Sequence, residues 1–172
     1  QLTTLGPLLV LEQVTSHGPL SIQSNGAATT AAIVNSHGGP LSIQAGGDLT
    51  ATANVTSNGG SLALTTGGSF VLSNPAALAS GGGAVTVSAV ENIVLAPGTL
   101  IAAGAGTVTL TAGGSATLSE VSSLSVVTIT VGGSIIDGDP GGIAAIAANQ
   151  AALVAEGSIG SANTPLQIAV SN

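Results

Sequence analysis

The strongest constraint on the fold is an internal repeat of about 21 residues. Short segments in which Leu, Ile or Val alternates with Ser, Thr, Gln or Ala recur along the chain. The step between them drifts from 19 residues (Val108 to Val127) to 24 residues (Val127 to Ala151). The segments lie at residues 20–23, 41–44, 62–65, 85–88, 108–111, 127–130 and 151–154. Alternation with a period of two is typical of a β-strand with one buried face, so each repeat is predicted to begin with a strand.

Each repeat also contains two further candidate strands. A glycine corner such as Gly46-Gly47 or Gly67-Gly68 usually follows the first strand, and we expect glycine there because a tight corner demands a positive φ. Second strands are predicted at 48–52, 69–72, 92–95, 115–118 and 134–136, and third strands at 53–55, 76–78, 99–101, 124–126 and 166–168. Three strands per repeat describe one triangular coil, and crossover handedness favours a right-handed one. The predicted fold is all-β: a single right-handed parallel β-helix, or β-solenoid, of about seven to eight coils.

Residues 143–154 leave two interpretations open. The segment is rich in Ala, and Ala has the highest intrinsic helix propensity, which favours a short helix. The register of the neighbouring repeats favours strands instead, because it places residues 151–154 one step after residues 127–130.

The charge balance excludes several classes of partner. The chain has 172 residues, a net charge of −7 and no Lys, Arg or Cys. Without a cation, contact with a phosphate backbone has no electrostatic basis, so we expect no nucleic-acid partner. No apolar run of about 18 residues is present, so we expect no membrane insertion. The absence of Cys excludes disulfides, thiol catalysis and zinc–thiolate sites.

The two ends of the sequence match the interior of the repeat. Residues 2–6 resemble residues 64–68, and Val170-Ser171-Asn172 resembles the segment that starts at Val55. Solenoids normally carry polar caps, and Lys often protects edge strands from pairing with other strands. The sequence shows no polar cap at either end and has no Lys. We therefore predict one solenoid domain over residues 1–172 that is uncapped at both ends. Each end is expected to contact more solenoid, either a second copy stacked end to end or the remainder of a larger chain.

The repeated Leu-x-Ile/Leu-x-x-Gly-Gly-Ser/Asp units and the closing stretch of residues 157–170 resemble the repeat regions of filamentous-haemagglutinin-type exoproteins and related very large bacterial surface adhesins. The resemblance covers nearly the whole chain. It implies export, a right-handed β-helix and a structural or adhesive role at the cell surface. From the repeat and this resemblance we expect a non-enzymatic extracellular structural protein, a rigid segment of an adhesin or of a head-to-tail filament.

The acidic residues favour structural roles over catalysis. The seven acids fall at different positions of the repeat, whereas general acid–base chemistry needs a pair at a defined separation; they are Glu12, Asp48, Glu91, Glu120, Asp137, Asp139 and Glu156. We therefore assign no catalytic residue and no cofactor. Asp137 and Asp139, in Asp137-Gly138-Asp139-Pro140, form a weak Ca²⁺ candidate, since alternating Asp and Gly can wrap this ion with oxygen ligands. The motif occurs once, which favours a plain turn.

Three other features suggest binding. His17 and His37 lie about one coil apart, so they are expected to stack at one corner, where a metal could bridge them; no third ligand recurs with them, which favours a corner role. Thr residues at 107–111 and 128–130 form outward pairs on consecutive coils. A flat Ser/Thr face that binds polysaccharide or ice is therefore the alternative function. Asn54-Val55-Thr56 is a glycosylation sequon, so glycans are a further candidate partner.

Overall fold

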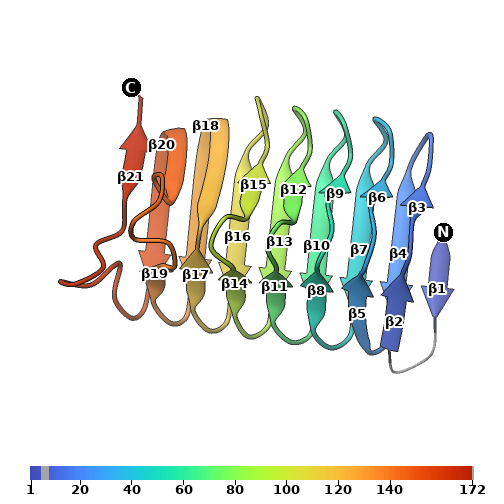
Figure 1. The fold of residues 1–172 in the computed structure, drawn as a ribbon, viewed down its shortest axis with the longest axis horizontal. Helices are drawn as coiled ribbons and strands as arrows, with labels where there is room; N and C mark the ends of the chain where they lie inside the picture. Colours follow the sequence, from blue (N-terminus) through green and yellow to red (C-terminus); the bar gives the residue numbers. More distant parts are fainter. Residues whose placement is uncertain (5–7, 172) are drawn as a thin grey trace.

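The computed structural model describes residues 1–4 and 8–171, and it is all-β. Its strands run parallel and stack into a β-solenoid of about eight turns, with the two termini at opposite ends of the stack (Figure 1). The predicted fold class is thereby confirmed. The described residues contain no helix, and so none that could cross a membrane. Of the two interpretations of residues 143–154, the strand is confirmed, because β20 covers Ile146–Ala155.

Each coil contributes strands to three walls. The first wall contains β1 (Leu2–Thr4), β4 (Leu20–Ser24), β7 (Leu41–Ala45), β10 (Leu62–Thr66), β13 (Val85–Ala89), β16 (Val108–Ala112) and the C-terminal parts of β18 (Glu120–Val131) and β20. The second wall contains β2 (Leu8–Leu11), β5 (Ala27–Thr30), β8 (Leu49–Ala51), β11 (Phe70–Leu72), β14 (Ile93–Leu95), β17 (Ala116–Leu118) and β19 (Ile135–Asp137). The third wall contains β3 (Val14–Thr15), β6 (Val34–Asn35), β9 (Val55–Thr56), β12 (Ala77–Ala79), β15 (Leu100–Ala102), the N-terminal parts of β18 and β20, and β21 (Ile168–Val170). Because β18 and β20 run from the third wall into the first, these walls form one 14-stranded sheet.

The register between coils follows the repeat read from the sequence. Leu20 pairs with Leu41, and Leu41 pairs with Leu62. The same column continues through Val85, Val108, Val127 and Ala151. Every predicted step is confirmed, including the steps of 19 and 24 residues. At the N-terminal end Leu2 pairs with Ile22, which is the register predicted for the first strand.

Inward side chains form continuous buried columns along the axis. One column of the first wall contains Ile22, Ile43, Leu64, Val87, Leu110 and Ile129, all of them buried. In the second wall Phe70 lies between Leu49 and Ile93 and is also fully buried. Burial of apolar surface stabilises a fold by about 25 cal/mol per Å², so these columns supply the main driving force for stacking.

The glycines at the Gly-Gly corners have a different role from the one predicted. Neither Gly46 nor Gly67 has a positive φ. Instead, a Cβ on Gly67 would lie less than 3.0 Å from the backbone of Gly46 in the preceding coil. Left-handed backbone occurs at the corner between the third and first walls, where His37 has a φ of 47° and Asn58 a φ of 52°. The prediction of positive φ at the Gly-Gly corners was wrong, because close backbone approach is what excludes a side chain there.

One predicted third strand is misplaced. Residues 124–126 are not the third-wall strand of their coil; Val121 holds that place, paired with Ile101 and Ile146, and Leu124 is 71% exposed. The reason is that Ser119 alone separates β17 from β18, so this coil is shortened between the second and third walls. At the C-terminal end Ile168 pairs with Ile146 and so takes the place of Val55, which confirms the register of the third strand predicted at 166–168. The separate matching of Val170 with Val55 was wrong, because Val170 lies two residues further on.

Candidate functional site

The two ends of the solenoid expose side chains of the inward type. At the N-terminal end Leu2 is 41% exposed. At the C-terminal end Ile159 and Ile168 are 48% and 43% exposed, and Leu153 is half-buried against the core. No charged residue lies in β1, β3, β20 or β21. These four end strands therefore lack the charges that usually guard edge strands. The charged residues near the two ends are Glu12, which follows β2, the buried Asp137 of β19, and Glu156, which follows β20.

The last coil also contains an ordered turn that departs from the coil path. The Ser161 N–H donates to the Thr164 carbonyl (3.0 Å), and the two hydroxyls lie 2.8 Å apart. Leu166 then returns and packs against the core, and Gly160 is buried beside it. Residues 160–166 thus cover part of the C-terminal end, while the first-wall edge of β20 stays apolar and half-exposed.

A polar ladder runs along the corner that opens the second wall. Asp48 Oδ1 accepts from the Ser69 N–H and Asn92 Oδ1 accepts from the Ser115 N–H, both at 2.8 Å. The Ser115 and Ser134 hydroxyls accept in the same way from the N–H groups of Ser134 and Ser158. The sequence signal for this ladder was the Ser, Asp or Asn that precedes each second-wall strand from β8 to β19, and its physical role was missed.

The two histidines stack as predicted. The imidazole rings of His17 and His37 have centroids 4.9 Å apart and planes inclined by 10°. Both side chains are exposed on successive coils. The His37 N–H donates to Asn35 Oδ1 (2.8 Å), and Asn58 Nδ2 donates to the same oxygen (3.3 Å). These bonds fix the left-handed corner from which the His37 ring projects.

Asp137 and Asp139, the weak Ca²⁺ candidates, occupy different surroundings. Asp137 is 3% exposed and lies in an inward column next to Leu118. Its Oδ1 accepts from the Asp139 N–H (3.0 Å), and its Oδ2 accepts from the Gln167 N–H (3.4 Å). Asp139 closes a turn through its carbonyl, which accepts from the Gly142 N–H (2.9 Å). The Asp137 carboxylate therefore holds this turn and the last coil through backbone N–H groups.

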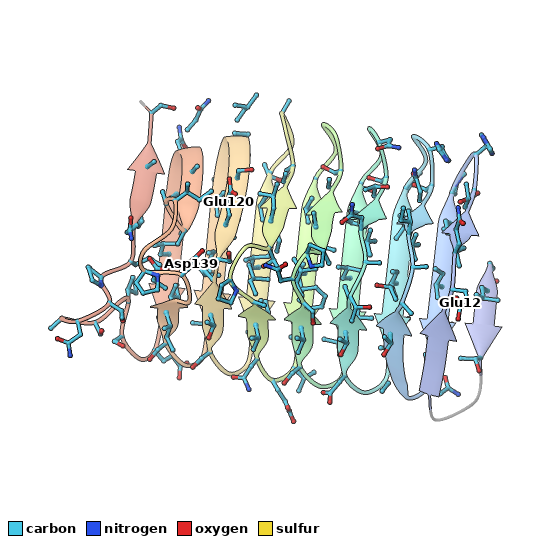
Figure 2. The ribbon with its side chains drawn as sticks, in the orientation of Figure 1. Glu12, Glu120 and Asp139 are labelled. Atoms are coloured by element: carbon cyan, nitrogen blue, oxygen red, sulfur yellow. The ribbon has the colours of Figure 1, made fainter. Side chains whose placement is uncertain are left out.

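The other acids are spread over the solenoid. Figure 2 shows Glu12 near the N-terminal end, far from Glu120 and Asp139. The Ser69 hydroxyl donates to Glu91 Oε2 (3.0 Å). Burial raises the pKa of the Glu120 carboxyl. Among the described residues, no three His, Cys, Asp or Glu side chains cluster in a way that could hold a metal ion.

The Thr pairs lie in register on the outer face of the first wall. Thr109 pairs with Thr128, and Thr111 pairs with Thr130. The coil before them places Thr86 and Ser88 in the same two columns. The face carries no charge from coil to coil, since its other outward residues are Ser21, Gln23, Ser42, Gln44, Ala63, Thr65, Ala152 and Val154. On the third wall, the sequon residue Asn54 is exposed, and its Oδ1 accepts from the Ala77 N–H (3.0 Å).

A shallow groove of about 420 Å³ runs beside the third wall, and the sequence reading missed it. Alanines and serines of β18, β20 and β21 line it, with Leu124 and Val170 exposed beside them. It forms because the corner between the third and first walls shortens. Residues 104–107 fill this corner in one coil, but in the coil of β20 only Asn149 and Gln150 do so. Such shortening has no signal in a single sequence.

No protein-family model, no curated protein and no solved structure matches this chain. The resemblance to filamentous-haemagglutinin-type repeats therefore stays a prediction that rests on the repeated units. The structure itself supports a coarser statement: the chain is a segment of β-solenoid.

Proposed function

We propose that this chain is a rigid structural element, part of an extracellular adhesin or filament on a cell surface. The observation that carries the proposal is the set of buried, mainly aliphatic columns that run from coil to coil. A stack in which every coil pairs with the next resists bending, because bending would open many backbone hydrogen bonds at once. The resemblance of the repeats to bacterial surface adhesins supports the extracellular site.

The ends support contact with further solenoid. Leu2, Ile159 and Ile168 are inward-type side chains that remain partly exposed, and exposed strand edges pair readily with other strands. In this proposal the neighbouring coils come from a second copy or from the remainder of a larger chain. No catalytic role is proposed for any residue, since the Asp137 carboxylate is engaged by backbone N–H groups and the chain has no Lys or Arg.

The extracellular site is tested by antibody labelling. An antibody raised against the purified chain is expected to label intact cells of the source organism along surface fibres. Labelling that appears only after the cells are permeabilised would contradict the extracellular part of the proposal. It would leave the solenoid fold itself untouched.

A second candidate function is binding through the Ser/Thr face. The observation that favours it is the register of Thr109 with Thr128 and of Thr111 with Thr130 on an uncharged wall. Fixed hydroxyl and methyl groups at regular spacing suit a periodic partner such as ice or an ordered polysaccharide. Thermal hysteresis or co-sedimentation with an insoluble polysaccharide would support this function. Thr128→Glu should abolish the effect, whereas Thr50→Glu, on the outer face of the second wall, should not.

A further inference from the structure

We propose that His17 and His37 together bind one divalent transition-metal ion, with Cu²⁺ held most tightly. This inference does not depend on the proposed structural role. The two imidazoles are the sole histidines of the chain, and their rings stack with centroids 4.9 Å apart. Imidazole nitrogen is a preferred ligand for Cu²⁺, Ni²⁺ and Zn²⁺, and among these ions Cu²⁺ binds nitrogen sites most strongly.

The fold brings the two ligands together and keeps them there. His17 and His37 are the residues that follow Ser16 and Ser36, and the backbone of Ser16 donates to the Asn35 carbonyl in the next coil (2.8 Å). The His37 corner is held by the Asn35 side chain, which accepts from the His37 N–H (2.8 Å). The folded backbone therefore already holds the two imidazoles close to each other, which raises the effective concentration of the second ligand.

The spacing of the rings is compatible with one shared ion. A metal–nitrogen bond of about 2.0–2.1 Å places two nitrogens on one ion roughly 3–4 Å apart. The ring centroids lie 4.9 Å apart, and in this proposal rotation about the side-chain bonds brings one nitrogen of each ring to the separation that the ion requires. Both side chains are exposed, so no packed neighbour opposes the rotation. Water completes the coordination, since the described residues offer no third histidine, cysteine or carboxylate within this group.

The charge of the chain favours the ion. The sequence has no Lys or Arg and a net charge of −7, so the general field attracts a dication and no cationic side chain repels it. In the structure no other role is apparent for the two rings, because both project outward from the corner.

The test is a titration of the full chain with Cu²⁺ alone, followed by calorimetry and electron paramagnetic resonance. The matched variants are His37→Asn and His17→Asn. Asn suits the His37 position, because Asn58 holds the same left-handed corner one coil later. The wild type is expected to bind one ion with two nitrogen ligands in its spectrum. Each single variant is expected to bind at least about tenfold more weakly, through one nitrogen.

A control separates imidazole ligation from general attraction to acids. Glu12→Gln removes the acid nearest in sequence to His17 and is expected to leave Cu²⁺ affinity within about twofold of the wild type. Equal affinity in the wild type and in either single-histidine variant would overturn the proposal. So would a spectrum of the wild type that shows one nitrogen ligand. Circular dichroism of each variant confirms that the solenoid is folded during the titration.

Discussion

At the residue scale, the side chain that a position can hold depends on the residues in the same column of the coils above and below. Phe70 is the one aromatic residue in the sequence, and it is fully buried between Leu49 and Ile93. Gly67 is required for the opposite reason, because a side chain there would meet the backbone of the preceding coil. Both positions depend on neighbours about one coil away, which explains why repetition along the chain predicts them better than local propensity does.

Phe70→Ala is expected to lower the free energy of unfolding by about 3–5 kcal/mol, because it leaves a cavity in a packed column. Urea denaturation measures the change. The matched control is Ile33→Ala, an exposed apolar position that should change stability by less than about 0.5 kcal/mol. Equal effects of the two substitutions would contradict the assignment of Phe70 to the core.

Gly67→Ala is expected to destabilise the chain by about 1–3 kcal/mol, because the added Cβ would force two coils apart. Gly141→Ala is the control, since a Cβ there meets nothing within 4 Å. Thermal denaturation of both variants measures the difference in their stability. A Gly67→Ala variant as stable as Gly141→Ala would show that the corner tolerates a side chain.

Glu120 predicts a specific dependence of stability on pH. Burial raises the pKa of its carboxyl in the folded state above the ordinary value of 4.5. As pH rises through that value, the unfolded state loses the proton first, so the contribution of this group to stability falls with rising pH. Glu120→Gln should therefore gain stability relative to the wild type at about pH 7 but not at about pH 3. Urea unfolding at both values tests this, with the exposed Glu156→Gln as a control that should show no such difference.

At the element scale, the strands could be predicted and some corners could not. The alternating segments fixed every register of the first wall, because a slip by one residue would turn all the inward side chains outward. The corners lack such a constraint. The shortening at Ser119 and the replacement of a column aliphatic by Asp137 have no counterpart in the other coils, so the third strand at 124–126 was misplaced and Asp137 was assigned to a turn instead of the core.

Asn92→Ala tests the polar ladder at the corner that opens the second wall. The Ser115 N–H would lose its acceptor, Asn92 Oδ1 (2.8 Å), and stability should fall by about 0.5–1.5 kcal/mol. Asn163→Ala, in the exposed turn of the last coil, should have a smaller effect. Urea denaturation compares the two, and equal losses would mean that the ladder does not contribute to stacking.

At the scale of the whole molecule, the proposed structural role depends on the continuity of the stack from one coil to the next. The columns and ladders join each coil to the next, and Glu12 lies far from Glu120 and Asp139 (Figure 2). The stacked pair of histidines was anticipated from the sequence, because Ser-His-Gly recurs one repeat apart. The groove beside β21 was not anticipated, because it depends on the lengths of the corners, which only the folded chain reveals.

Electron cryomicroscopy of the purified chain shows directly whether successive coils stack along one axis. The expected result is rods whose density repeats along the axis at about 4.8 Å, the spacing of hydrogen-bonded strands, with three walls around a filled core. Rounded particles without that axial repeat, or density for helices, would contradict the stacked solenoid and with it the structural role proposed for this chain.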